Sequence, residues 1–167
     1  IYIRSRGNSG TNIFKFLMNE AVKTNNISKT YPGVLANSNV SITINESSIH
    51  AVVGENGAGK STLMKILYGM IKPDSGNIEI FDNSASISSP KEAINLGIGM
   101  VHQHFMLAKN LTVLENIILG IDRASLKNLG LNKYKKQIQD VMKTYSLDID
   151  LNMFVDELSV GEKQRVE

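Results

Sequence analysis

The sequence predicts an α/β domain followed by a helical part, and three observations lead to this fold class. An alternating strand pattern over 40–44 and a short apolar run over 49–53 precede a glycine-rich loop. A helical repeat follows that loop. Strand patterns then stop near residue 105, and only helical patterns remain. We therefore expect a disordered or extraneous leader over 1–17, an α/β core over 18–105 and a helical part over 106–167.

Composition limits the possible functions. The 167 residues suffice for one domain of ordinary size, and the net charge of +2 argues against a dedicated nucleic-acid binder. The chain has no cysteine, which excludes a disulfide framework, a cysteine-based zinc site and a thiol nucleophile. No apolar run approaches the roughly 20 residues of a membrane-spanning helix. Any work at a membrane is therefore expected to go through partner proteins.

The α/β half is expected to alternate strands and helices. Apolar residues from Ile49 to Val53 predict a buried strand that ends at Gly54. The helix after the loop is indicated by apolar residues at helical spacing, namely Leu63, Ile66, Leu67 and Met70. A turn over 72–76 and a strand with Ile78 and Ile80 on one face follow.

The next helix has the start signals Ser89, Pro90 and Glu92. Gly97 is expected to end it, and 98–101 to form a strand that places Gln103 at its C-terminal end.

The helical half shows two further capping boxes, one at Thr112 and Glu115 and one at Ser159 and Glu162. Gly120 is expected to end the helix that begins near Thr112. Between the two boxes, a longer helix is indicated by an apolar stripe at Tyr134, Ile138, Val141 and Tyr145.

Gly54, Gly59, Lys60 and Ser61 fit the phosphate-loop pattern G-x-x-x-x-G-K-[ST]. Glycines let successive N–H groups point inward at a polyphosphate, and the start of the following helix adds its dipole. Lys60 would reach the β- and γ-phosphates, and the Ser61 hydroxyl would bind Mg²⁺. The sequence thus predicts an ATP and Mg²⁺ site formed by Asn56, Gly57, Ala58, Gly59, Lys60, Ser61 and Thr62. The alternative is an ordinary glycine-rich turn; the strand and helix patterns around the loop favour the phosphate site.

Two further segments make a family resemblance specific. The run over 158–164, L-S-V-G-E-K-Q, resembles the ABC signature, whose core is L-S-G-G-Q, and the run over 101–105, V-H-Q-H-F, resembles the Q-loop. Over about residues 20–167 the chain resembles the ATP-binding domain of ABC transporters, of the type that imports nucleosides and simple sugars. The resemblance implies a P-loop NTPase fold of the ABC type, with an antiparallel β part and a helical subdomain, truncated before the Walker B segment.

The resemblance also implies roles for residues outside the loop. Gln103 is expected to touch Mg²⁺ and the attacking water, and Tyr31 to stack on adenine. Ser159 and Gly161 are expected to hold the γ-phosphate of ATP bound by the opposite ABC domain. The signature departs from its consensus at Val160 and at Glu162, whose negative charge is expected to weaken ATP capture.

Each role has a simpler alternative. Gln103 alone would be a surface residue, Ser159 with Glu162 a plain capping box, and Tyr31 a core or turn tyrosine. His102 and His104 lie two residues apart and could face one way on a strand. No third ligand cluster is visible in the sequence, so we expect no metal site there.

Three classes of function stay open: an ATPase subunit of an ABC transporter, a soluble ABC protein of translation or DNA repair, and an inactive truncated remnant. The resemblance favours the transporter. It implies transmembrane permease subunits and a second ABC domain as partners, an indirect link to a substrate-binding protein, no nucleic acid, and a peripheral place on the cytoplasmic face of the membrane. Because the Walker B Asp and the residue that orients water lie beyond residue 167 in the family pattern, we expect no hydrolysis by these residues alone.

Overall fold

The computed structural model describes residues 2–3, 19–121 and 131–167. The chain divides into two compact units, 1–100 and 101–167. The division lies a few residues before the boundary that the sequence patterns indicate.

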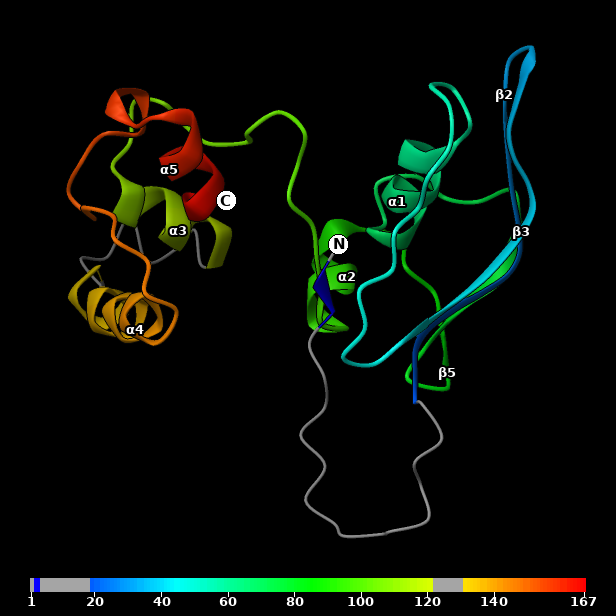
Figure 1. The fold of residues 1–167 in the computed structure, drawn as a ribbon, viewed down its shortest axis with the longest axis horizontal. Coiled ribbons are helices and arrows are strands. Elements are labelled where there is room, and N and C mark those ends of the chain that lie inside the picture. The colour runs from blue at the N-terminus through cyan, green and yellow to red at the C-terminus, as the bar shows by residue number, and fades with distance from the viewer. Residues whose placement is uncertain (1, 4–18, 122–130) are drawn as a thin grey trace, which may run out of the picture. The chain divides into compact units, whose positions relative to one another are not determined.

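The first unit contains a four-stranded antiparallel sheet (Figure 1). Its spatial order is β3-β2-β4-β5. The strands are β2 (Glu20–Tyr31), β3 (Val34–Asn45), β4 (Ser75–Ile80) and β5 (Asn83–Ala85). Strands β2 and β3 form a long hairpin, and β4 pairs with the other edge of β2. The predicted strand pattern at 40–44 and the predicted strand at 78–80 are therefore confirmed.

Two helices and a small second sheet complete this unit. Helix α1 (Lys60–Leu67) follows the glycine loop, and α2 (Pro90–Asn95) begins at Ser89, whose hydroxyl accepts the N–H of Glu92. Strand β6 (Ile98–Gly99) pairs antiparallel with β1 (Tyr2–Ile3). The strand expected over 98–101 is thus shorter than predicted. Tyr2 and Ile3 are the part of the expected leader that the structure describes; the rest of that expectation lies outside the described residues.

The core of the first unit lies between α1 and the sheet. Ile66 of α1 and Ile27 of β2 are fully buried. Thr24 of β2 is a buried polar residue beside them. Its hydroxyl donates to the carbonyl oxygen of Val40 and accepts the N–H of Ile42, both on β3. The other buried apolar residues of this cluster are Val22, Leu63, Leu67, Ile78, Ile80, Ile87, Ala93 and Ile98. The predicted helical spacing is confirmed at 63–67, whereas Met70 lies beyond α1 and is 45% exposed.

The predicted buried strand over 49–53 is wrong. These residues form no strand, and Ile49 and Val53 are 102% and 89% exposed. A strand needs a hydrogen-bonded neighbour, and none of the described strands pairs with this segment. The apolar run therefore lies in water in this structure.

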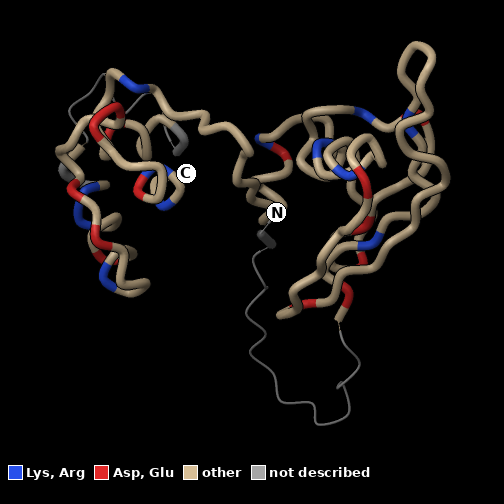
Figure 2. Tube along the Cα trace, turned by 45° about the horizontal axis from the view of Figure 1, so that its top comes forward, with Lys and Arg blue, Asp and Glu red and all other residues tan. Residues whose placement is uncertain are grey.

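The second unit is helical. It contains α3 (Val113–Ile121), α4 (Leu131–Thr144), the 3-10 turn η1 (Val155–Glu157) and α5 (Val160–Val166). Its core is formed by Val113, Leu114, Ile118, Ile138, Leu151, Val155 and Leu158. Lys and Arg positions are interspersed with Asp and Glu positions along this unit (Figure 2).

Two details of the second unit differ from the sequence predictions. Helix α3 continues through Gly120, which was expected to end it. Glycine is tolerated inside a helix at a cost of about 1 kcal/mol, so the residue alone does not fix a helix end. In α4, Ile138 is buried and Tyr134 packs on the core, but Val141 is 52% exposed and Tyr145, beyond the helix, is 69% exposed.

Across the described residues, no helix combines the length and the apolar character needed to cross a membrane.

Candidate functional site

The loop before α1 is a tight backbone turn that requires glycine. Gly57 and Gly59 have φ angles of +86° and +84°, in the left-handed region that favours glycine. A Cβ atom on Gly59 would lie 2.0 Å from the carbonyl oxygen of Ala36 on β3. Gly59 is also the N-cap of α1 and provides no side-chain cap. The N-terminus of α1 therefore presents its backbone N–H groups to the loop, as an anion site requires.

Lys60 is folded back onto this loop. Its Nζ atom donates to the carbonyl oxygens of Gly54 and Glu55, at 2.7 Å each. Ser61 is exposed on the first turn of α1, and Thr62 is half-buried beside it. The helix start at Gly59, the positive charge of Lys60 and the hydroxyl of the exposed Ser61 thus lie on three successive residues.

Asn37 of β3 attaches the hairpin to the loop. Its Nδ2 atom donates to the carbonyl oxygen of Gly59 at 3.3 Å, and the residue is 6% exposed. Its Oδ1 atom is buried and has no hydrogen-bond partner among the described residues. Because Asn37 and the backbone of Ala36 both touch Gly59, this part of β3 sets the position of the loop.

Tyr31 lies at the end of β2 and is 37% exposed. It pairs with Val34 across the hairpin, and Lys29 pairs with Asn37. Tyr31 is therefore about two strand residues, roughly 7 Å, farther along the hairpin than the contact with Gly59. The sequence-predicted residues Tyr31, Asn56, Gly57, Ala58, Gly59, Lys60, Ser61 and Thr62 all belong to the first unit.

Gln103 belongs to the second unit and is exposed. The preceding backbone N–H, of His102, donates to Oε1 of Glu167 at 3.1 Å, so the Gln103 segment is tied to the end of α5. The following segment is held by Asn116 of α3. The Asn116 side chain accepts the N–H of Ala108 at 2.8 Å and donates to carbonyl oxygens of the same segment, at Ala108 and Thr112.

Ser159 and Glu162 form the predicted capping box at the start of α5. The Glu162 carboxylate accepts the hydroxyl and the N–H of Ser159, at 2.6 and 2.8 Å, and the Ser159 hydroxyl accepts the N–H of Glu162. The Ser159 hydroxyl, followed by its N–H, holds the pKa of Glu162 below the usual glutamate value. Glu162 thus occupies the donors of Ser159, and the neighbouring Gly161 is exposed.

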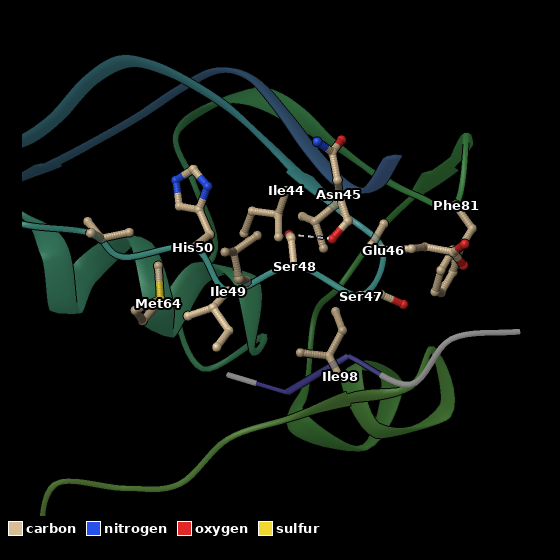
Figure 3. A pocket seen from close by; sticks show the side chains of 14 residues that line it. Ile44, Asn45, Glu46, Ser47, Ser48, Ile49, His50, Met64, Phe81 and Ile98 are labelled. Atoms are coloured by element: carbon tan, nitrogen blue, oxygen red, sulfur yellow. Dashed lines mark hydrogen bonds between the residues drawn. The ribbon is translucent and has the colours of Figure 1, made fainter. Parts of the chain in front are cut away.

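A separate open pocket of about 360 Å³ lies in the first unit (Figure 3). Met64 and Leu67 of α1 line it, together with Ile98 and the segment that follows β3. Figure 3 shows Ile49 and His50 on that segment beside Met64. None of its lining residues belongs to the loop over 54–62, so it is distinct from the candidate phosphate site.

Sequence reasoning missed Asn37 and Asn116. Asn37 contacts a residue 22 positions away, and no local pattern indicates such a contact. Asn116 follows the capping box at Thr112 directly, but its bonds to Ala108 lie before the helix that the box predicts.

A family model described as "ABC transporter" matches residues 37–167. The matched range contains the phosphate loop, Gln103 and the Ser159 segment. The chain belongs to the ABC transporter family.

Several curated proteins similar to this chain are named as import ATP-binding proteins. It is 42% identical over 150 residues to the guanosine import ATP-binding protein NupO of Bacillus subtilis, covering 90% of this chain and 29% of that protein. It is 45% identical to the nucleoside import ATP-binding protein NupA of Lactococcus lactis, covering 84% of this chain and 28% of that one. The glucose import ATP-binding protein TsgD13 of Haloferax volcanii is 41% identical, and the match covers 87% of this chain and 32% of that protein. The chain therefore spans less than a third of the length of these relatives.

Solved structures support the fold. A nucleotide-free ATP-binding cassette from an ABC transporter has a TM-score of 0.72 at 29% identity, covering 88% of this chain and 62% of that one. A dimeric bacterial ABC transporter cassette has a TM-score of 0.68 at 28% identity, and the match covers 87% of this chain and 66% of that one. The predicted fold class, an α/β ABC-type domain with an antiparallel part and a helical part, is confirmed.

Proposed function

We propose that this chain is the ATP-binding part of an ABC importer subunit that couples ATP binding and hydrolysis to the uptake of nucleosides or simple sugars. The phosphate loop carries this proposal. Its glycines in the left-handed region, its uncapped helix start and its lysine form a cradle for a polyphosphate within one turn of chain.

The residues present fit Mg²⁺–ATP. A Cβ on Gly59 would meet the backbone of Ala36 on β3, so the lack of a side chain at this position lets the start of α1 and the loop lie against that strand. The backbone N–H groups of 56–62 would bind the phosphates. The Lys60 ammonium group would balance their negative charge, and the Ser61 hydroxyl would bind the magnesium ion. Bound Mg²⁺ neutralises charge on the phosphate oxygens during phosphoryl transfer. The role that the family resemblance implies for Gln103, toward Mg²⁺ and the attacking water, is part of this proposal.

Lys60 changes its hydrogen-bond partners when a nucleotide binds to the loop. Its ammonium group bonds to two neutral carbonyl oxygens of its own loop. Phosphate oxygens are charged acceptors and form the stronger hydrogen bonds with an ammonium group. Nucleotide binding therefore replaces two internal bonds of Lys60 and frees the carbonyls of Gly54 and Glu55.

Tyr31 would hold the base, because it stands on the hairpin that touches Gly59. Ser159 and Gly161 would hold the γ-phosphate of a nucleotide bound to a second ABC domain. The similarity of this chain to a dimeric ABC transporter cassette supports the presence of such a second domain. Since Glu162 already occupies the Ser159 donors, that nucleotide has to displace the Glu162 carboxylate.

The importer assignment is supported by the names of the relatives, which are nucleoside and sugar import proteins. It includes permease subunits and a second ABC domain as partners, a substrate-binding protein as an indirect one, and a peripheral place on the cytoplasmic face of the membrane. Nucleic acid is not among the proposed partners, because basic and acidic residues are interspersed along the described chain (Figure 2).

Magnesium-dependent ATP binding to wild type and Lys60→Ala tests the site. Removing the ammonium group is expected to weaken binding about ten- to hundredfold, the range for a lost charged hydrogen bond. Lys65→Ala is the matched control, since Lys65 is an exposed lysine on the same helix. Unchanged ATP affinity of Lys60→Ala, or no binding by a folded wild-type chain, contradicts the proposed site.

Hydrolysis is proposed for the complete ABC domain. The expectation that residues 1–167 do not turn ATP over by themselves stays a prediction. Phosphate release by the purified chain with Mg²⁺ measures it, and turnover abolished by Lys60→Ala would prove it wrong.

A further inference from the structure

The turn over 72–76 is fastened to the end of β2 by Asp74. The backbone N–H of Asp74 donates to the carbonyl oxygen of Ser28 at 2.9 Å. Its carboxylate accepts the backbone N–H of Thr30 on Oδ2 at 2.7 Å and the Nζ of Lys29 on Oδ1 at 2.6 Å. Asp74 thus holds three successive residues of β2, directly before Tyr31.

Lys29 links Asp74 to the Tyr31 ring, and the bonds of Asp74 to Ser28, Lys29 and Thr30 are called the Asp74 clamp. Its Nζ atom lies over the ring, 5.9 Å from the centroid, within the range of a cation–π contact. The Lys29 side chain is 18% exposed, so it is packed rather than extended into water. Asp74 therefore acts on Tyr31 twice, through the backbone of Thr30 and through the ammonium group above the ring.

This arrangement differs from that of an ordinary turn aspartate. Such residues bond to their own turn, usually two residues on. The Asp74 carboxylate bonds to residues 44 and 45 positions away. Exposed ion pairs contribute little to stability, so the main consequence of the Asp74 clamp is the orientation of the end of β2.

We propose that Asp74 is a positioning residue for nucleotide binding: through Lys29 and Thr30 it holds Tyr31 as the platform on which the base of ATP stacks. The inference rests on the proposed function, since it needs a nucleotide in the neighbouring phosphate loop. It assigns a task in base recognition to a turn that the phosphate-loop pattern does not include.

The test compares ATP with inorganic tripolyphosphate, both with Mg²⁺, on the full chain. The second ligand has the phosphates and no base. Tyr31→Ala is expected to weaken ATP binding about tenfold, the order of one lost stacking contact, and tripolyphosphate binding less than twofold. Asp74→Ala is expected to show the same pattern, and the double variant to be no weaker than Tyr31→Ala alone.

Three further variants separate orientation from folding. Lys29→Met keeps an unbranched side chain without the charge and is expected to weaken ATP binding selectively. Asp74→Asn keeps an acceptor for the Thr30 N–H and is expected to lie between wild type and Asp74→Ala. Glu20→Ala breaks a comparable ion pair at the other end of β2, with Lys23 at 3.1 Å, and is expected to change neither affinity.

The outcomes are distinguishable. The proposal is overturned if folded Asp74→Ala and Lys29→Met bind ATP like wild type, if they lose both ligands equally, or if their effects add to that of Tyr31→Ala. If Tyr31→Ala binds ATP normally while Lys60→Ala does not, the phosphate site stands and the inference fails. If wild type binds neither ligand, the proposed function fails and the inference fails with it.

Discussion

At the scale of single residues, the two glycines of the phosphate loop are constrained in different ways. Both have φ near +85°, which costs a residue with a side chain roughly 1–2 kcal/mol. Around Gly57, no atom lies within 4 Å of an added Cβ. At Gly59, the added Cβ would meet the carbonyl oxygen of Ala36 and the amide of Asn37. Only the second position combines backbone strain with a close approach of another strand.

This difference predicts unequal effects of two alanine substitutions. Gly57→Ala is expected to lower the free energy of unfolding by about 1–2 kcal/mol. Gly59→Ala is expected to cost more and to abolish ATP binding, because either the loop or β3 must move. Urea unfolding and ATP titration of both variants measure these effects. Equal losses of stability would show that the contact with β3 is not maintained in solution.

The residues that follow a short pattern could be predicted, and the residues that support them could not. Lys60 and Ser61 lie where the phosphate-loop pattern places them, at the start of α1. Asn37 and Asp74 act on segments far away in the sequence, through contacts that depend on strand pairing. A polar residue in a strand or turn gives no local sign of such a contact.

At the scale of elements, helix starts were predicted more accurately than helix ends. At each of the start signals Ser89, Thr112 and Ser159, the hydroxyl oxygen accepts the backbone N–H of the residue three positions on, as expected. These bonds join neighbouring residues, so the local sequence suffices to predict them. Of the two helix ends expected at a glycine, α2 ends before Gly97, whose φ is +86°. Helix α3 instead continues one residue past Gly120, to Ile121.

The capping box at Ser159 predicts a pH dependence for the start of α5. The Ser159 hydroxyl and N–H lower the pKa of Glu162 in the folded chain relative to the unfolded one. The stabilisation is therefore complete above the ordinary glutamate pKa of about 4.3 and is lost as the pH falls through the lowered folded value.

NMR titration of the Glu162 carboxyl and the Ser159 amide should give one shared midpoint below 4.3. Ser159→Ala removes the hydroxyl and is expected to move the Glu162 midpoint upward. A Glu162 midpoint at the ordinary value in wild type would mean that the box does not form in solution.

At the scale of the whole molecule, segments that depend on distant partners were predicted least well. The apolar run over 49–53 has the composition of a buried strand, but a sequence pattern does not provide the neighbouring strand that its backbone needs. The pairing of β1 with β6 joins the two ends of the first unit, and no periodicity indicated it. Antiparallel pairing of β2 with β3 needs only a short turn. The sequence pattern indicated part of β3, at 40–44, but not β2.

Because 49–53 is exposed, the same substitution is expected to change the free energy of unfolding differently at two isoleucines of the first unit, Ile66 and Ile49. Ile66 is fully buried on α1, so Ile66→Ala is expected to lower the free energy of unfolding by about 2–5 kcal/mol. Ile49 is 102% exposed, so Ile49→Ala is expected to change it by less than about 0.5 kcal/mol. Urea unfolding followed through NMR signals of the first unit measures both.

A large loss in Ile49→Ala would mean that the segment is paired and buried in solution, as its apolar pattern indicates. Since 49–53 leads directly into the phosphate loop, that result would also give the loop a second fixed side, in addition to the contact of β3 with Gly59. A small loss would leave β3 and α1 as the supports of the loop, and Asn37 would then account for a larger part of its rigidity.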